Sequence, residues 1–197
     1  MAAILFATQG RDSVAGDSAK RDEGRRLSGS NDTHPNGPRQ LHFGWGEQDS
    51  LVEALARPIH RVSVFVAQPA WGTSAITLWG DDGIGLRICS RMHDVAERIE
   101  VGVLEFSWAR DVHEKRVFVS LGERFAEINS VLKLVIEESS VFAESGVVVS
   151  ARSGEEIVIV AGAGPFTLAV KGIEDCGSFD PEYELADYRS ETLYSKR

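Results

Sequence analysis

Cysteine is scarce in this sequence, and its scarcity argues against a fold built on disulfide bonds. Cys89 and Cys176 are the only cysteines among 197 residues, whereas small secreted domains that rely on disulfides carry several pairs. Cys89 follows Leu86 and Ile88 in an apolar stretch, where a free thiol acts as a small core filler. We therefore expect two reduced thiols in a cytoplasmic protein.

Long hydrophobic runs are absent as well. No stretch approaches the roughly 18 to 20 apolar residues that span a bilayer. The apolar stretch Met1–Ala7 has no basic residue before it, which is atypical of a secretory signal. Hydrophobic residues make up 43% of the chain and charged residues 26%, as in an ordinary globular domain. The composition therefore predicts one soluble domain that does not engage a membrane.

Basic residues are few in the last third of the chain. The net charge is −9, and residues 123–187 contain 13 acidic and four basic side chains. Such a surface repels nucleic acid, whereas it attracts and steers a basic protein. Acidic side chains can also serve only to keep a small protein soluble.

Three regions differ in composition. Residues 9–40 contain only Val14 and Leu27 as aliphatic side chains larger than alanine, so this segment cannot bury enough apolar area to fold. We expect a flexible N-terminal arm over residues 1–40, a single β-rich domain over 41–172, and an acidic C-terminal tail over 173–197.

Alternating apolar residues predict strands throughout the domain. Val62, Val64 and Val66 share one face, for example. Gly80–Gly83 and Arg152–Gly154 are turn signals that predict two hairpins. The predicted strands are residues 60–67, 74–79, 85–90, 99–108, 117–121, 131–136, 146–150, 156–160 and 167–170.

A short helix is predicted before the first strand. Asp49 or Ser50 can cap it, and it runs through Leu55 and stops before Pro58. Residues 122–129 are compatible with a helical turn or a loop. We therefore expect an α+β fold that is predominantly antiparallel β, with about eight strands and one or two short helices.

A glycine pair after an apolar strand has the look of a dinucleotide-binding turn. Gly162 and Gly164 follow Ile157–Val160, but a helix must open at such a motif. Thr167–Val170 instead has the pattern of a strand. We therefore predict a connection between two strands and no cofactor.

No pattern of catalytic or metal-ligating residues stands out. His93, Asp94 and Glu97 lie close together and His113 lies further on, but HExxH, CxxC and Gly-x-Ser-x-Gly motifs are absent. One alternative stays open, namely a small enzyme or ligand-binding domain with a site near His93, His113 and the Gly162–Pro165 loop.

Aromatic and acidic side chains are the better candidates for binding a partner. Trp45 and Trp71 are flanked by glycine or proline, which is typical of plugs over a core or of anchors for a partner. The candidate partner-binding residues are Trp45, Trp71, Glu137, Glu138, Asp180, Glu182, Tyr183 and Glu184.

The C-terminal third carries a resemblance to a known group of proteins. The segments Glu144–Val149, Gly154–Ala163, Pro165–Val170 and Phe179–Tyr183 resemble small acidic bacterial proteins of the polymorphic-toxin immunity type. The resemblance covers roughly residues 60–188. It implies a protective protein that plugs or masks a toxin, and it attaches no role to any single residue.

Charge and resemblance together favour a non-catalytic protein that binds a basic protein partner, such as a toxin. A structural subunit of a larger complex is the other alternative. The sequence is compatible with a monomer or with a homodimer formed through an edge strand.

Overall fold

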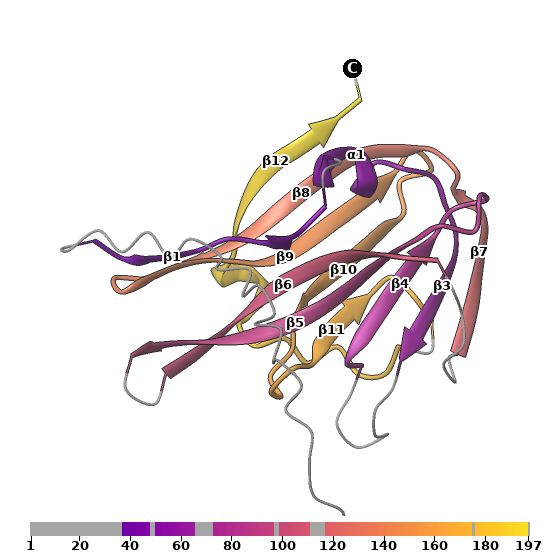
Figure 1. Ribbon diagram of the computed structural model, residues 1–197. Helices are drawn as coiled ribbons and strands as arrows, with labels where there is room; N and C mark the ends of the chain where they lie inside the picture. Colours follow the sequence, from indigo (N-terminus) through magenta and orange to yellow (C-terminus); the bar gives the residue numbers. More distant parts are fainter. Residues whose placement is uncertain are drawn as a thin grey trace, which may run out of the picture.

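The chain folds into two six-stranded β-sheets that pack face to face (Figure 1). The computed structural model describes residues 37–47, 50–65, 73–96, 99–110, 117–174 and 176–196. Sheet A has the order β11 (Leu168–Lys171), β10 (Glu156–Ala161), β9 (Val141–Ala151), β8 (Ile128–Glu137) and β12 (Arg189–Ser195), with β1 (Arg39–Leu41) beside β9. Sheet B has the order β2 (Gly44–Trp45), β6 (Ile99–Ala109), β5 (Gly85–Ala96), β4 (Ala75–Trp79), β3 (Ile59–Phe65) and β7 (Val117–Phe125).

The predominantly β character predicted from the sequence is confirmed. Both predicted hairpins form, β4 with β5 and β9 with β10. The predicted short helix is α1 (Leu51–Leu55), and Ser50 caps it by accepting the Glu53 backbone N–H. Among the strands that the structure describes, the β1–β9 and β2–β6 pairs are parallel and the other pairs are antiparallel.

The described residues form twelve strands, in place of the eight or so expected from the sequence. The extra strands include β1 and β2, which are too short to display an alternating pattern in the sequence. Residues 122–129 also belong mainly to strands β7 and β8. Gly122 has a positive φ of 56° and lies where the β3–β7 register shifts, so this interruption concealed the strand.

The C-terminal segment differs from the predicted acidic tail. Strand β12 pairs with β8 at the edge of sheet A, between Arg189 and Ser195. The side chains of β12 are half-buried or exposed, so this edge strand is polar enough to resemble an acidic tail in the sequence. At the other boundary, β1 already begins at Arg39, inside the predicted arm, whose residues 1–36 lie outside the described part of the chain.

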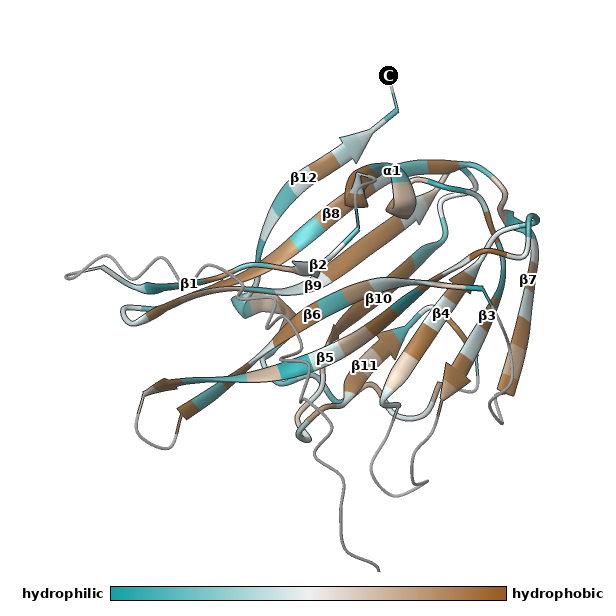
Figure 2. Ribbon diagram, viewed as in Figure 1, coloured by the Kyte–Doolittle hydropathy of each residue, from teal (hydrophilic) through white to brown (hydrophobic). Residues whose placement is uncertain are grey.

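The main core lies between the two sheets. Its side chains include Val62, Val64, Ile76 and Ile88 from sheet B and Val147, Val149, Ile157 and Ile159 from sheet A. Strands β9 and β10 are hydrophobic over most of their length (Figure 2). The reason is that β10 is covered on both faces, since Val158 and Val160 pack in a second cluster with Tyr188 from the C-terminal segment.

The two sheets also meet at one end, where two long hairpins extend side by side. A small core joins β6 to β9 through Val101, Val103, Val141 and Ala143. Gly102 lets β6 approach β10 closely as well, because a Cβ atom there would lie 2.5 Å from the Cβ of Ala161. The ends of the β5–β6 and β8–β9 hairpins therefore lie at the same side of the molecule (Figure 1).

Candidate functional site

Most of the acidic residues singled out from the sequence lie at the end of the molecule formed by these hairpins. Strands β8, β9, β10 and β11 pair antiparallel in that order, so the β8–β9 turn and the β10–β11 turn lie at the same end of sheet A. The C-terminal segment crosses this end. We name the set the hairpin-end surface, and its members are Glu100, Glu137, Glu138, Asp180, Glu182, Tyr183, Glu184 and Asp187.

Backbone hydrogen bonds hold the C-terminal segment in place. The Glu182 N–H donates to the Ala161 carbonyl at 3.0 Å, and the Ala163 N–H donates to the Asp180 carbonyl at 3.0 Å. The Glu182 side chain reaches across to sheet B, where its Oε2 accepts the Gly102 N–H at 2.9 Å. One acidic segment therefore connects the ends of both sheets.

Burial and a neighbouring carboxylate act on Glu182 in the same direction. Burial raises the pKa of Glu182 above its ordinary value, the Gly102 N–H offsets part of this rise, and the negative charge of Glu100 adds to it. Ser90 lies nearby with a buried hydroxyl that has no hydrogen-bond partner within the described residues. Glu182 is thus a carboxylate whose charge the fold does not neutralise.

Two tyrosines pack beneath the acidic side chains. Tyr183 and Tyr188 form an edge-to-face pair with ring centroids 6.2 Å apart. Burial, followed by the charges of Glu182 and Glu138, raises the pKa of Tyr183 to about 12. The charges of Glu138 in the β8–β9 turn and of Glu182 thus both act on Tyr183, although 44 positions separate the two glutamates in the sequence.

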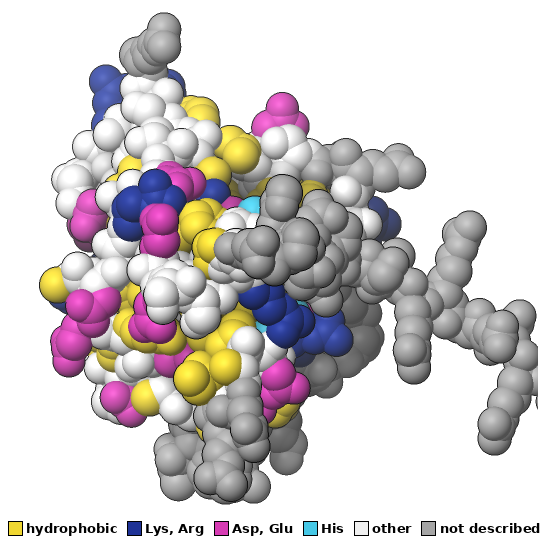
Figure 3. Space-filling model, turned by 90° about the vertical axis from the view of Figure 1, so that its left-hand side faces the viewer, with side chains coloured by type: hydrophobic (Ala, Val, Ile, Leu, Met, Phe, Trp, Pro, Cys, Tyr) yellow, Lys and Arg dark blue, Asp and Glu magenta, His cyan; other side chains and the backbone are white. Residues whose placement is uncertain are grey.

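The carboxylates of the hairpin-end surface are mostly unpaired. Glu137 forms an ion pair with Arg189 at 3.1 Å. Within the described parts of the chain, Glu138, Asp180 and Glu184 have no ion-pair partner. Acidic and hydrophobic side chains alternate over this face, with a few basic side chains among them (Figure 3).

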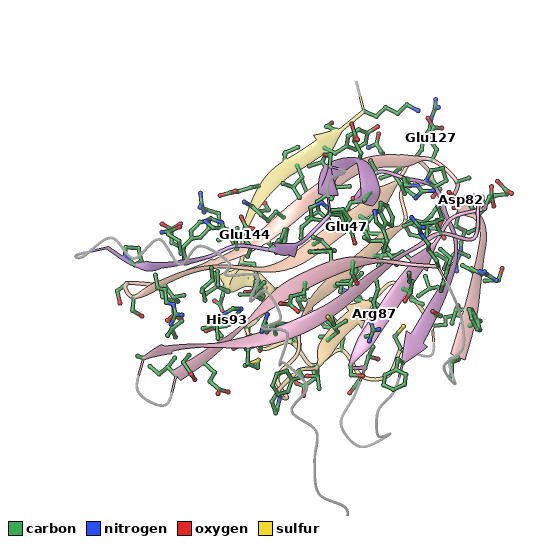
Figure 4. All side chains as sticks on the ribbon, viewed as in Figure 1. Glu47, Asp82, Arg87, His93, Glu127 and Glu144 are labelled. Carbon is green, nitrogen blue, oxygen red and sulfur yellow. The ribbon has the colours of Figure 1, made fainter. Side chains whose placement is uncertain are left out.

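The opposite end of sheet A is different, because Glu127 and Glu155 there are paired with basic side chains. Glu127 binds Arg152 at 3.0 Å and also contacts Lys196. Arg124 lies 3.5 Å from Glu155. Figure 4 places Glu127 far from His93 and Glu144. We call this end of the molecule, with the pairs of Glu127 and Glu155, the compensated end, and the end that carries the hairpin-end surface the uncompensated end.

Sequence reasoning missed a buried ionic cluster around Glu144. Lys133 Nζ lies 2.6 Å from Glu144 Oε1 and 2.9 Å from Glu191, while Glu144 Oε2 accepts the Phe43 N–H at 2.7 Å. Burial alone would raise the pKa of Glu144, but these hydrogen bonds and one with His42 lower it. The cluster fixes the segment between β1 and β2 and is fully satisfied, so it reads as structural.

The two tryptophans predicted as partner contacts have different outcomes. Trp45 packs edge-to-face on Trp108, with ring centroids 5.6 Å apart, and rests against the main core. It therefore has the surroundings of a plug over the core. Trp71 lies outside the described residues.

The alternative site near the histidines lies partly outside the described residues, because His113 does. Burial, followed by the charges of Arg91 and Arg39, lowers the pKa of His93. Among the described residues, no three His, Cys, Asp or Glu side chains are placed to hold a metal ion. A cavity beside α1, lined by Leu55, Leu86 and Trp108 among others, has a volume of about 10 Å³, which is room for one water molecule.

The loop after the glycine pair has the predicted character. Gly162–Thr167 is a turn between β10 and β11, and β11 follows where a dinucleotide-binding motif would need a helix. In the described part of the chain, no helix has the length and hydrophobicity of a membrane span. The chain matches no protein-family model, no curated protein and no solved structure.

Proposed function

We propose that this protein is a non-catalytic binding protein whose hairpin-end surface captures a basic protein partner. The observation that carries the proposal is the unequal pairing of carboxylates at the two ends of sheet A. Glu138, Asp180 and Glu184 are left without a cation, whereas Glu127 and Glu155 are paired. A basic partner would supply the missing cations and would be steered by the field of the whole chain, whose net charge is −9.

The resemblance to immunity proteins points to the class of partner, a toxin. An immunity protein must block a toxin without chemistry of its own, and acidic side chains beside a half-buried and a buried tyrosine, Tyr183 and Tyr188, are suited to that task. We therefore infer that the partner is a basic toxin, whose active surface the hairpin-end surface masks.

The test is a pair of charge-reversed variants. A fluorescent deca-arginine peptide serves as the basic probe, and its affinity for the full chain is measured by anisotropy at low and high salt. The variant Glu138→Lys/Glu184→Lys should bind the peptide at least about tenfold more weakly, because both side chains are exposed and unpaired.

The matched control is Glu123→Lys/Glu174→Lys. Both of these residues are exposed, and they lie toward the compensated end of the molecule. The change in net charge is identical, so this variant should lose about threefold at most, through the long-range field alone. Equal losses in both variants would show that net charge, and not a surface, binds the peptide.

A further inference from the structure

The β10–β11 turn presents an aromatic side chain under backbone strain. Gly164, Pro165, Phe166 and Thr167 form a turn in which the Thr167 N–H donates to the Gly164 carbonyl at 3.1 Å. Phe166 has a φ of 58°, and it is the one non-glycine residue with a positive φ among the described residues. The third position of such a turn normally belongs to glycine or asparagine, since a bulky side chain there is strained.

The strain does not serve to bury the ring. Phe166 is 60% exposed, which is the largest exposure of any large hydrophobic side chain in the described residues. Ala163 and Pro165 beside it are exposed too. Because the ring stays exposed to water, the fold gains little stability from burying it. Neither packing nor backbone preference therefore explains a phenylalanine at this position.

The turn itself is held firmly. Thr167 Oγ1 donates to the Gly164 carbonyl at 2.6 Å, and the Gly162 N–H donates to the Thr167 carbonyl at 2.9 Å. At its base, the Leu168 N–H donates to the Thr73 carbonyl at 2.7 Å. The ring therefore projects from a rigid support, which lowers the entropy that a binding partner must remove.

Acidic residues border this apolar tip. Ala163 is bonded to the backbone of Asp180, and Gly162 forms a bridge with Pro181, so the turn adjoins the segment that carries Glu182. No basic residue occurs in Glu156–Val170. An apolar anchor next to unpaired carboxylates has the composition of an interface centre beside its polar rim.

We propose that Phe166 is the anchor side chain with which this protein enters an apolar pocket, rimmed by basic groups, on its partner. The basic rim of the pocket rests on the proposed function, whereas the apolar anchor is inferred from the β10–β11 turn alone. A pocket that takes one aromatic ring fits a single exposed phenylalanine better than a flat apolar surface does.

Two forms of β-cyclodextrin serve as probes of the full chain. The neutral ring offers an apolar cavity that can enclose one phenyl group, and the form with ammonium groups on its rim mimics the complete pocket. In a calorimetric titration, both should bind the wild-type chain, the ammonium form more tightly and with a dependence on salt. Phe166→Ala should weaken both by at least about tenfold.

Phe118→Ala is the matched control, because Phe118 is 45% exposed and already stacks with Arg61 at 5.4 Å. It should leave the affinity for both probes unchanged. Binding that Phe118→Ala weakens as much as Phe166→Ala, or no binding at all, would overturn the proposal. If the basic rim alone is wrong, the neutral ring still binds at Phe166 while the ammonium form gains nothing.

Thermal stability separates an anchor from a structural residue. Phe166→Ala should melt within about 2 °C of the wild-type chain, and Phe166→Gly should melt about 2–4 °C above Phe166→Ala, since glycine relieves the positive φ. A fall of more than about 4 °C in both variants would assign the ring to the fold and overturn the proposal. The proposal would also be overturned if the chain self-associated, or bound phosphatidylcholine vesicles, only when Phe166 is present. Phe166 would then contact a second copy of the chain or a membrane, and not a pocket on a partner protein.

Discussion

At the scale of single residues, the buried carboxylate of Glu144 and the half-buried carboxylate of Glu182 have pKa shifts in opposite directions. Glu144 receives hydrogen bonds from Lys133, from the Phe43 backbone and from His42, and these outweigh burial and lower its pKa. Glu182 receives one backbone N–H, so burial dominates and its pKa rises. Glu144 thus contributes stability at neutral pH that is lost as the pH falls through its lowered pKa. Glu182 contributes stability at acidic pH that is lost as the pH rises through its raised pKa.

This difference predicts the effect of Glu182→Gln on stability. Glutamine keeps an oxygen that can accept the Gly102 N–H and removes the half-buried charge, so the variant should be more stable than the wild-type chain at pH 7, by up to about 1 kcal/mol. The gain should shrink as the pH falls through the raised pKa of Glu182 and vanish below the ordinary glutamate pKa of 4.5, where the carboxyl is protonated in both the folded and the unfolded wild-type chain. Urea unfolding at several pH values measures it.

Glu144→Gln is the natural comparison, because it should destabilise at pH 7 and lose that effect in acid. A destabilised Glu182→Gln at pH 7 would mean that the charge of Glu182 is compensated by a partner.

The sequence carried some of these residue roles and not others. The acidic bias and the tyrosine at position 183 were visible, and they led to most of the hairpin-end surface. The ionic cluster around Glu144 was not visible, because its partners His42 and Phe43 lie 102 and 101 positions from Glu144. Phe166 did leave a signal, since phenylalanine follows proline in a turn where glycine is the usual residue.

At the scale of elements, the C-terminal segment differs most from what the sequence predicts. It covers the outer face of sheet A, where Tyr188 packs against residues of β8 and β10. Polar composition and spaced aromatic residues predicted a tail, because a segment that lies on an existing sheet needs only a few apolar contacts. The hairpins, by contrast, were predictable from alternation and turn residues, which are local signals.

Docking of this segment predicts unequal effects of two substitutions within it. Tyr188→Ala should cost about 2–4 kcal/mol, because the side chain is 9% exposed and belongs to the second core cluster. Leu185→Ala, three residues earlier and 37% exposed, should cost less than about 1 kcal/mol. Denaturant midpoints compare the two, and equal small costs would show that the segment is not part of the core.

At the scale of the whole molecule, the fold determines where the acidic side chains of the last third of the chain lie. Residues 123–187 carry 13 acidic and four basic side chains, and nothing in that count shows where the charges fall. Antiparallel pairing sends the β9–β10 turn and the β8–β9 turn to opposite ends. Arg124, Arg152 and Lys196 pair with carboxylates at the first end, whereas Arg189 pairs with Glu137 and Arg39 adjoins Ser140 at the second. The basic-partner proposal depends on this asymmetry and not on the net charge.

The most direct test is a map of where a basic ligand binds. Amide resonances of the full chain are followed by NMR as the deca-arginine peptide is added at moderate salt. We predict shifts confined to residues 99–102, 137–139, 163–166 and 180–184, with residues 122–127 and 152–155 unchanged. Shifts spread evenly over acidic positions, or centred on residues 122–127 and 152–155, would contradict the account.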